Sequence, residues 1–169
     1  KFCLTLCFGL INSMAVADIN TSMITAFDRD TSDLRWRTVN DNVMGGRSRG
    51  DYQINDGVLS FRGSTNTNGG GFSSIRTSRV SLDLSDASGF SMRLRGDGRV
   101  YTFRVTTSRG RVSYWAEFPT RAHGKWVEVR IPFETFWPNI MGRRLRGPAL
   151  DPSAISGLGL MIYDKQDGP

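Results

Sequence analysis

The stretch FSMRLR at residues 90–95 alternates apolar and polar side chains without a break. Alternation with a period of two is typical of a strand that buries one face and exposes the other. The GDG tripeptide at residues 96–98 then turns the chain into residues 99–107, where Tyr101, Phe103 and Val105 share one face. We therefore predict two consecutive strands joined by a glycine turn.

Further strand patterns recur on both sides of this pair. The NDG tripeptide at residues 55–57 separates two of them and predicts a hairpin. The remaining strands are expected at 72–76, 112–118, 125–131 and 157–163. No long window has a helical period, and residues 132–137 form at most one short turn. The pattern predicts an all-β fold, an antiparallel β-sandwich of jelly-roll type, and the missing crossover helices exclude a parallel α/β sheet.

Composition and charge narrow the class of protein. The 169 residues suffice for one domain with a substantial core. The net charge of +6 is carried almost wholly by arginine, because only three lysines are present. Arginine suits recognition of carboxylates, phosphates and acidic partners, although exposed strand faces also account for many arginines. No run of like charges suggests a tail that binds nucleic acid, so we expect no nucleic-acid partner.

Residues 1–17 have the features of a signal peptide. Lys1 precedes the apolar run 2–11, and AVA at residues 15–17 offers a cleavage pattern. The run is too short to span a bilayer, so we expect no integral membrane segment once the leader is removed. A buried first strand is the alternative. Cleavage would remove Cys3 and Cys7 and leave a thiol-free exported domain, periplasmic or secreted. Residues 18–35 are polar and predict an N-terminal arm or a first edge strand.

The stretch WRTVNDNVMGGRS at residues 36–48 predicts an ordered loop. It contains a Val-Met pair that looks buried, followed by Gly45 and Gly46, which favour backbone angles that other residues resist. Asn40 and Asp41 act either as loop staples or as ligand contacts. The second glycine loop follows the same logic: Gly96 and Gly98 serve turns, and Asp97 bonds the neighbouring backbone.

This stretch resembles the signature WxxVNDxVMGGxS of the complex I intermediate-associated protein 30 (CIA30) family. Further blocks resemble the same family in the same order and extend the likeness over residues 36–169. They are GGGFSSIR (69–76), LRGDGRVY (94–101), IPFETF (131–136) with Pro138 and Gly142-Arg143, LDPSAI (150–155) and LGLMIYDKQDGP (158–169).

The resemblance implies a galactose-binding-domain-like jelly roll with a role in protein assembly. Mitochondrial members of the family act as chaperone-like factors for the membrane arm of respiratory complex I. The leader here differs from a mitochondrial presequence, which indicates a bacterial exported relative. The family usually continues past Gly168-Pro169 into one more strand, so the resemblance implies a domain at 36–169 that lacks its C-terminal strand.

Candidate catalytic and metal-binding groups are sparse in this sequence. His123 is the only histidine and lies in a predicted turn outside any triad pattern. The glutamates Glu117, Glu128 and Glu134 show no spacing typical of a glycosidase pair. Asp28 opens a calcium-loop-like stretch that lacks the required glycine and glutamate. We predict no catalytic residue, no metal site and no cofactor.

The favoured hypothesis is a non-catalytic domain that binds other polypeptides during assembly or export. Its recognition surface would combine polar residues that stand within apolar blocks, if the fold brings them together: Asn40, Asp41, Arg76, Arg143, Asp164, Lys165 and Gln166. The alternative is a carbohydrate-binding module in which Trp115 or Trp137 serves as a platform. A hydrolase that uses Asp or Glu ranks last.

Overall fold

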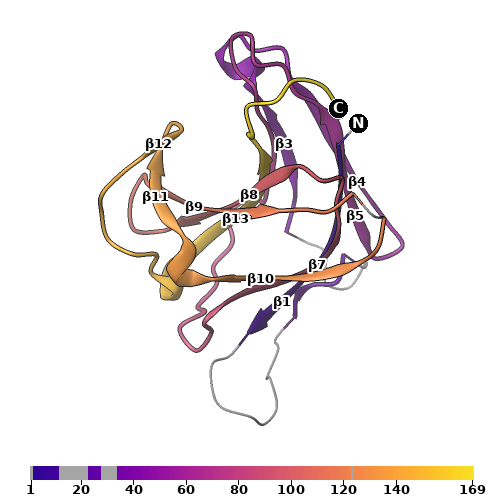
Figure 1. Ribbon diagram of the computed structural model, residues 1–169. Coiled ribbons are helices and arrows are strands. Elements are labelled where there is room, and N and C mark those ends of the chain that lie inside the picture. The colour runs from indigo at the N-terminus through magenta and orange to yellow at the C-terminus, as the bar shows by residue number, and fades with distance from the viewer. Residues whose placement is uncertain (1, 12–22, 28–33, 123) are drawn as a thin grey trace.

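The computed structural model describes residues 2–11, 23–27, 34–122 and 124–169, and it consists of two facing antiparallel sheets (Figure 1). Sheet A has the strand order β10-β7-β1-β5-β4, and β2 pairs with β1. Its strands are β1 (Phe2–Ile11), β2 (Met23–Thr25), β4 (Arg49–Asn55), β5 (Val58–Ser64), β7 (Gly89–Arg95) and β10 (Val127–Pro132).

Sheet B has the strand order β12-β11-β9-β8-β13-β6-β3. Its strands are β3 (Arg37–Asn40), β6 (Ser73–Arg76), β8 (Val100–Thr107), β9 (Ser113–Pro119), β11 (Trp137–Ile140), β12 (Arg143–Arg144) and β13 (Ile155–Ile162). Three short 3₁₀ turns complete the described part of the chain: η1 (Asp41–Met44), η2 (Phe133–Thr135) and η3 (Pro152–Ala154). Every strand pair among the described residues is antiparallel, which confirms the all-β prediction.

The core lies between the two sheets, and the alternation at residues 90–95 explains how it forms. Phe90, Met92 and Leu94 of β7 are fully buried and point toward sheet B. The Phe90 ring meets Phe103 of β8 edge to face, with 4.7 Å between the centroids. Each such side chain contributes about 1.5–3 kcal/mol when it leaves water. The alternate residues of β7 and β8 therefore face outward, where a ligand can reach them.

The predicted hairpin is present as β4 and β5. Asn55 pairs with Val58, and the two residues between them have positive φ angles, 50° at Asp56 and 73° at Gly57. A two-residue turn with both φ angles positive matches the twist of the flanking strands. The NDG tripeptide was therefore a sufficient signal for this hairpin.

In the full chain, residues 2–11 take the form of the alternative, a buried first strand. These residues form β1, which pairs with β5 on one side and β7 on the other. Leu4 is fully buried. The physical reason is that an apolar run with the length of a leader also suits a strand covered on both faces. Both cysteines lie within this strand.

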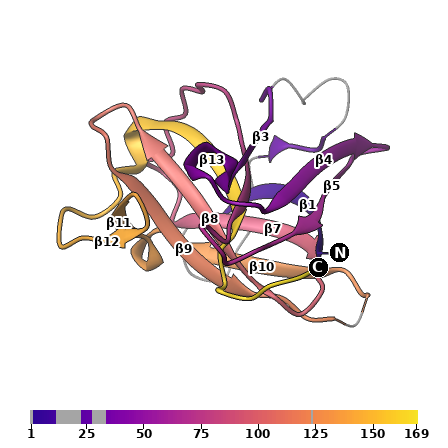
Figure 2. The same ribbon diagram turned by 90° about the horizontal axis from the view of Figure 1, so that it is seen from above.

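The rest of the N-terminal region is described only in part. Within 18–35, β2 pairs with β1 next to Phe8 and Gly9. The acidic stretch 28–33 and His123 lie outside the described residues. Figures 1 and 2 show the two ends of the chain side by side, where Gly168 bridges to Thr65 just beyond β5. No helix in the described part of the chain is long and apolar enough to cross a membrane.

Removal of residues 1–17 tests the role of β1. The truncated chain should lose both strand pairings and the burial of Leu4, which alone corresponds to about 2–3 kcal/mol. Because 1 kcal/mol shifts the midpoint of a domain of this size by about 2–4 °C, thermal unfolding should occur about 5 °C lower or more. An unchanged midpoint would contradict a structural role for β1 and favour a removable leader.

Candidate functional site

Asp41 is the central residue of the loop region above sheet B. It is 0% exposed, and its carboxylate accepts hydrogen bonds from the Ser48 amide at 2.8 Å and the Ser48 hydroxyl at 2.5 Å. The amides of Gly71 and Phe72 donate to the same carboxylate at 2.6 and 3.3 Å. One buried charge therefore joins the segment 41–48 to the segment 65–72.

Two glycines make room for this carboxylate. A Cβ at Gly46 would lie 2.3 Å from Asp41 Cγ, and a Cβ at Gly70 would lie 2.4 Å from Asp41 Oδ2. Side chains at either position would displace the carboxylate from its donors. Gly45 has a φ of 85°, which ends η1 in the left-handed region. The glycines of both sequence blocks thus serve one buried acid.

Hydrogen bonding keeps Asp41 ionised despite its burial. Burial acts to raise the pKa of this carboxyl, but the donors from Ser48, Gly71 and Phe72 favour the charged form and outweigh it. The net pKa lies below the ordinary value. A group held in this way cannot also bind a ligand, so the placement of Asp41 on a recognition surface is wrong.

Asn40 is also occupied within the fold. Its amide nitrogen donates to the Gly50 carbonyl at 3.1 Å, and its amide oxygen accepts from the Ser73 hydroxyl at 2.6 Å. These bonds tie β3 to β4 and β6. The structure therefore places Asn40, like Asp41, in a stapling position.

Arg99 organises the other end of the same region. It is largely buried and pairs with Asp164 through two contacts, Nε to Oδ2 at 2.8 Å and Nη2 to Oδ1 at 2.6 Å. The guanidinium also donates to the carbonyls of Gln166 and Gly168 and to the Thr65 hydroxyl. The hydrogen bonds that Arg99 donates to Asp164 raise the pKa of Arg99 above its usual value. Asp164 is thus an internal partner of Arg99, and its side chain is only 4% exposed.

The GDG loop supports this arrangement. Asp97 accepts from the Arg99 amide at 3.0 Å and from the Tyr101 hydroxyl at 2.9 Å. A Cβ at Gly96 would lie 2.1 Å from Thr120, and Gly98 has a φ of 97°. All three loop residues have structural roles in this geometry.

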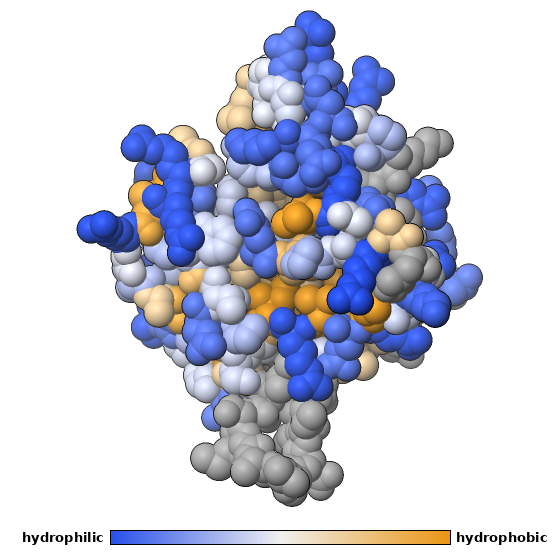
Figure 3. Space-filling model, in the orientation of Figure 1, coloured by the Kyte–Doolittle hydropathy of each residue, from blue (hydrophilic) through white to orange (hydrophobic). Residues whose placement is uncertain are grey.

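The outer face of sheet B forms a groove, which we call the outer groove. The β11–β12 hairpin and the loop around η1 rise on opposite sides of β8, β9 and β13 (Figure 1). Figure 3 shows the hollow between these two lobes, whose tips are hydrophilic. Two cavities in this groove contain the candidate binding residues.

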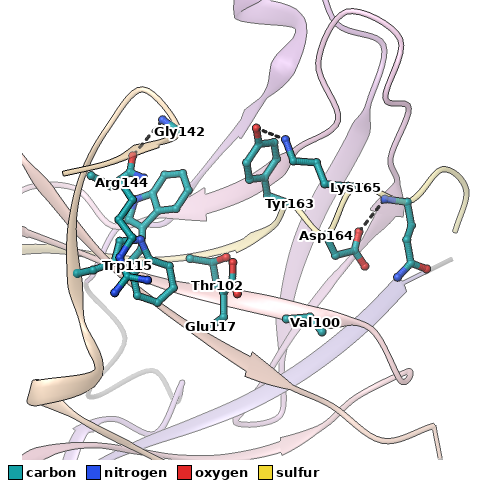
Figure 4. Close-up of a pocket in the computed structure, with 12 residues that line it drawn as sticks. Val100, Thr102, Trp115, Glu117, Gly142, Arg144, Tyr163, Asp164 and Lys165 are labelled. Atoms are coloured by element: carbon teal, nitrogen blue, oxygen red, sulfur yellow. Dashed lines mark hydrogen bonds between the residues drawn. The ribbon is translucent and has the colours of Figure 1, made fainter. Parts of the chain in front are cut away.

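One part of the outer groove is an aromatic cavity of about 570 Å³. Trp115 and Trp137 are direct cross-strand neighbours in its wall, and the Tyr163 ring meets Trp115 edge to face at 6.2 Å. Arg144 lies over the Trp137 ring at 4.8 Å. Figure 4 shows Glu117, Arg144 and Lys165 around the same space. Aromatic faces beside charged and polar groups can bind a peptide or a sugar.

A neighbouring cavity of about 260 Å³ is mainly apolar. Val43 and Met44 of η1 line one side, and Met141 of the β11–β12 turn lines the other. These side chains are 70%, 65% and 96% exposed. The sequence suggested a buried Val-Met pair, and that interpretation is wrong, because the Asp41 staple turns the pair outward. The local sequence pattern could not predict the exposure of Val43 and Met44, because it depends on contacts with the segment 65–72.

The predicted recognition residues meet only in part. Arg76 and Lys165 line the outer groove, and both Asp164 and Gln166 join Lys165 in the lining of the aromatic cavity. Lys165 donates to the Tyr163 hydroxyl and lies 3.9 Å from that ring. Arg143 is exposed on β12 beside the cavity-lining Arg144. No cluster of three or more histidine, cysteine, aspartate or glutamate residues in the described ranges could hold a metal ion.

Solved structures with the same fold bind sugars. The chain is similar to the family 11 carbohydrate-binding module of the cellulase Lic26A-Cel5E of Clostridium thermocellum, with a TM-score of 0.54 and 16% identity over 79% of this chain and 81% of that one. A second similar structure is the family 11 module from Clostridium thermocellum in complex with a β-1,3-1,4-mixed-linked tetrasaccharide. Its TM-score is 0.51 and its sequence identity is 14%, over 95% of this chain and 89% of that chain. These likenesses show that the fold is a galactose-binding-like jelly roll.

Sequence comparison assigns the family. The model of the complex I intermediate-associated protein 30 (CIA30) family matches residues 25–169, and the chain belongs to this family. The mitochondrial complex I intermediate-associated protein 30 of Mus musculus is 34% identical over 99 residues, which cover 54% of this chain. The match spans 30% of the length of that relative.

Asp41→Asn should destabilise the domain by about 3 kcal/mol, because an amide offers one acceptor and sets a donor against the Gly71 amide. The pKa of Asp41 is depressed on folding, so its contribution is present above the unfolded value of about 3.9 and is lost as the pH falls further. Denaturant unfolding at several pH values should show that the free energy of unfolding falls less steeply at acid pH for the variant than for the wild type. An equally steep fall in both proteins would contradict this role.

Proposed function

We propose that this protein is a non-catalytic binding domain that engages other polypeptides as an assembly factor. The observation that carries the proposal is the pair of loops that expose Val43, Met44 and Met141 toward one cavity. Exposed apolar side chains gathered at a hollow are typical of protein-binding sites. Methionine in particular adapts to varied partners, which suits a chaperone-like factor.

Family membership supports the same proposal. The Mus musculus relative is named for its association with an intermediate of complex I. We infer that the client here is likewise a subunit or intermediate of a larger complex. Residues 1–17 lead us to propose export as well, into the periplasm or the medium. Cleavage after residue 17 would remove β1 from the mature chain, so the truncation described above also bears on export.

The triple variant Val43→Ser, Met44→Ser, Met141→Ser tests the polypeptide proposal. A photo-crosslinker placed at Ile140, beside this patch, should capture client polypeptides that mass spectrometry identifies. Each lost apolar contact contributes about 1.5–3 kcal/mol when buried, so the three changes should weaken capture about tenfold or more. Thermal stability should stay the same, because the side chains are exposed.

Met23→Ser is the matched control for this experiment. Met23 is 62% exposed and lies on β2 of sheet A, away from the outer groove. It should leave capture unchanged. Equal capture by the wild type and the triple variant would contradict the proposal.

A second candidate function is carbohydrate binding, which the aromatic cavity supports. Trp115, Trp137 and Tyr163 line a space large enough for a short glycan, and the family 11 modules share the fold. Aromatic rings commonly pack against the apolar faces of sugars.

Calorimetry with a β-1,3-1,4-mixed-linked tetrasaccharide tests this candidate. If the protein binds this sugar, Trp137→Ala should weaken binding about tenfold, while Trp126→Ala, just before β10 of the other sheet, should not. Trp126 is the suitable control because it lies under Arg93 and Arg95 outside the cavity. Absence of heat for the wild type would remove the candidate.

A further inference from the structure

A row of arginines crosses the outer groove next to the apolar cavity. Arg104 of β8 pairs with Gly159 of β13, Gly159 pairs with Arg76 of β6, and Arg76 pairs with Arg37 of β3. Residues directly opposite in antiparallel strands point to the same face of a sheet. The three side chains therefore share the outer face, and we call them the arginine row.

The glycine in this row lets the two partly buried arginines share one space. Arg104 and Arg76 lie two strand spacings apart, about 10 Å, with no side chain between them. A Cβ at Gly159 would lie 2.9 Å from the Ile75 carbonyl and 3.3 Å from Arg76 Cγ. Gly159 thus lets the stem of Arg76 lie close against the sheet, and all three arginines line a cavity of about 470 Å³.

No acid neutralises the arginine row within the described ranges of the chain. None of its members has a carboxylate within ion-pair distance there, whereas Arg99, Arg109 and Arg130 each pair with one. Among the described residues, Arg76 makes one side-chain hydrogen bond, from Nε to the Ser74 hydroxyl at 3.1 Å. Like charges placed directly opposite each other destabilise a sheet. No carboxylate of the described residues offsets this repulsion through an ion pair.

The charge state of the row agrees with this geometry. Burial, together with the charges of Arg76 and Arg37, lowers the pKa of Arg104 to about 10. Burial and Arg37 also lower the pKa of Arg76. The guanidinium groups stay charged at neutral pH, and an anion between them would relieve their mutual repulsion.

We propose that the arginine row binds carboxylate side chains of the client polypeptide, beside an apolar side chain held by Val43, Met44 and Met141. The inference rests on the proposed function, and Arg76 carries the connection because it lines both the basic and the apolar cavity. Arginine binds carboxylates through two parallel hydrogen bonds, which favours glutamate or aspartate over a neutral polar residue. The client segment therefore contains acidic and apolar residues close together in its sequence.

Selection from a displayed library of random peptides tests this proposal on the full chain. Peptides enriched on the wild type should place Asp or Glu next to Leu, Ile, Met or Phe. A selected peptide should bind the variant Arg76→Gln/Arg104→Gln about tenfold or more weakly. The Glu→Gln form of that peptide should lose a similar factor on the wild type but little more on the variant, which makes the test independent of any folding defect.

Arg62→Gln/Arg130→Gln is the matched control, since it removes the same charge from exposed positions of sheet A. It should change the dissociation constant by no more than about twofold. Thermal unfolding of the arginine-row variant should occur at the wild-type temperature or above it, because like-charge repulsion is removed. Acidic peptides bound equally well by the row variant and the wild type would overturn the proposal.

Two other outcomes separate the possible failures. Enriched peptides that are apolar but not acidic, and that respond only to the Val43, Met44 and Met141 changes, would overturn the arginine row and leave the proposed function standing. No enrichment at all would contradict both. Oligothymidine binding that is tighter than any peptide, and that is lost in the row variant, would overturn the assignment to a polypeptide.

Discussion

The buried carboxylate of Asp41 is the constraint on which the architecture of the outer groove depends. Four donors from Ser48, Gly71 and Phe72 hold it, and Gly46 and Gly70 leave the space that it fills. A buried charge is costly unless it is fully hydrogen-bonded, so the two loops that supply the donors must keep their positions. The signature glycines and the acid form one structural unit.

The consequence of this unit appears at the surface. Because Asp41 fixes η1 from inside, Val43 and Met44 face the outer groove with no contribution to the core. Arg99 has a comparable role at the other end, where it holds the segment 164–168 and thereby places Lys165 at the aromatic cavity. The buried side chains of Asp41 and Arg99 thus position the exposed side chains that line the outer groove.

Much of the fold could be predicted from the sequence, because strand periodicity is a local signal. The alternation at 90–95 and the turn at 55–57 specified β7 and the β4–β5 hairpin correctly. The apolar run at 2–11 left two alternatives open, since a leader and a buried strand have similar compositions. Composition alone does not predict whether such a segment pairs with neighbouring strands, as β1 pairs with β5 and β7.

The candidate site could be predicted much less well, because it depends on strand register. Arg37, Arg76 and Arg104 are far apart in the sequence and become neighbours only through the order β3-β6-β13-β8. Asp41 and Asp164 were predicted for a recognition surface because they are polar residues within apolar blocks, whereas the fold ties both carboxylates to internal donors. A polar residue in a glycine-rich block is equally compatible with a staple and a ligand contact until its donors are known.

Amide hydrogen exchange of wild type and Asp41→Asn is the most direct test of the account. The carboxylate joins two segments, so the variant should lose protection in 41–48 and in 65–72 together, while the amides of β7 and β8 keep theirs. Loss confined to 41–48, with 65–72 protected as before, would contradict the claim that one buried acid holds both walls of this loop region.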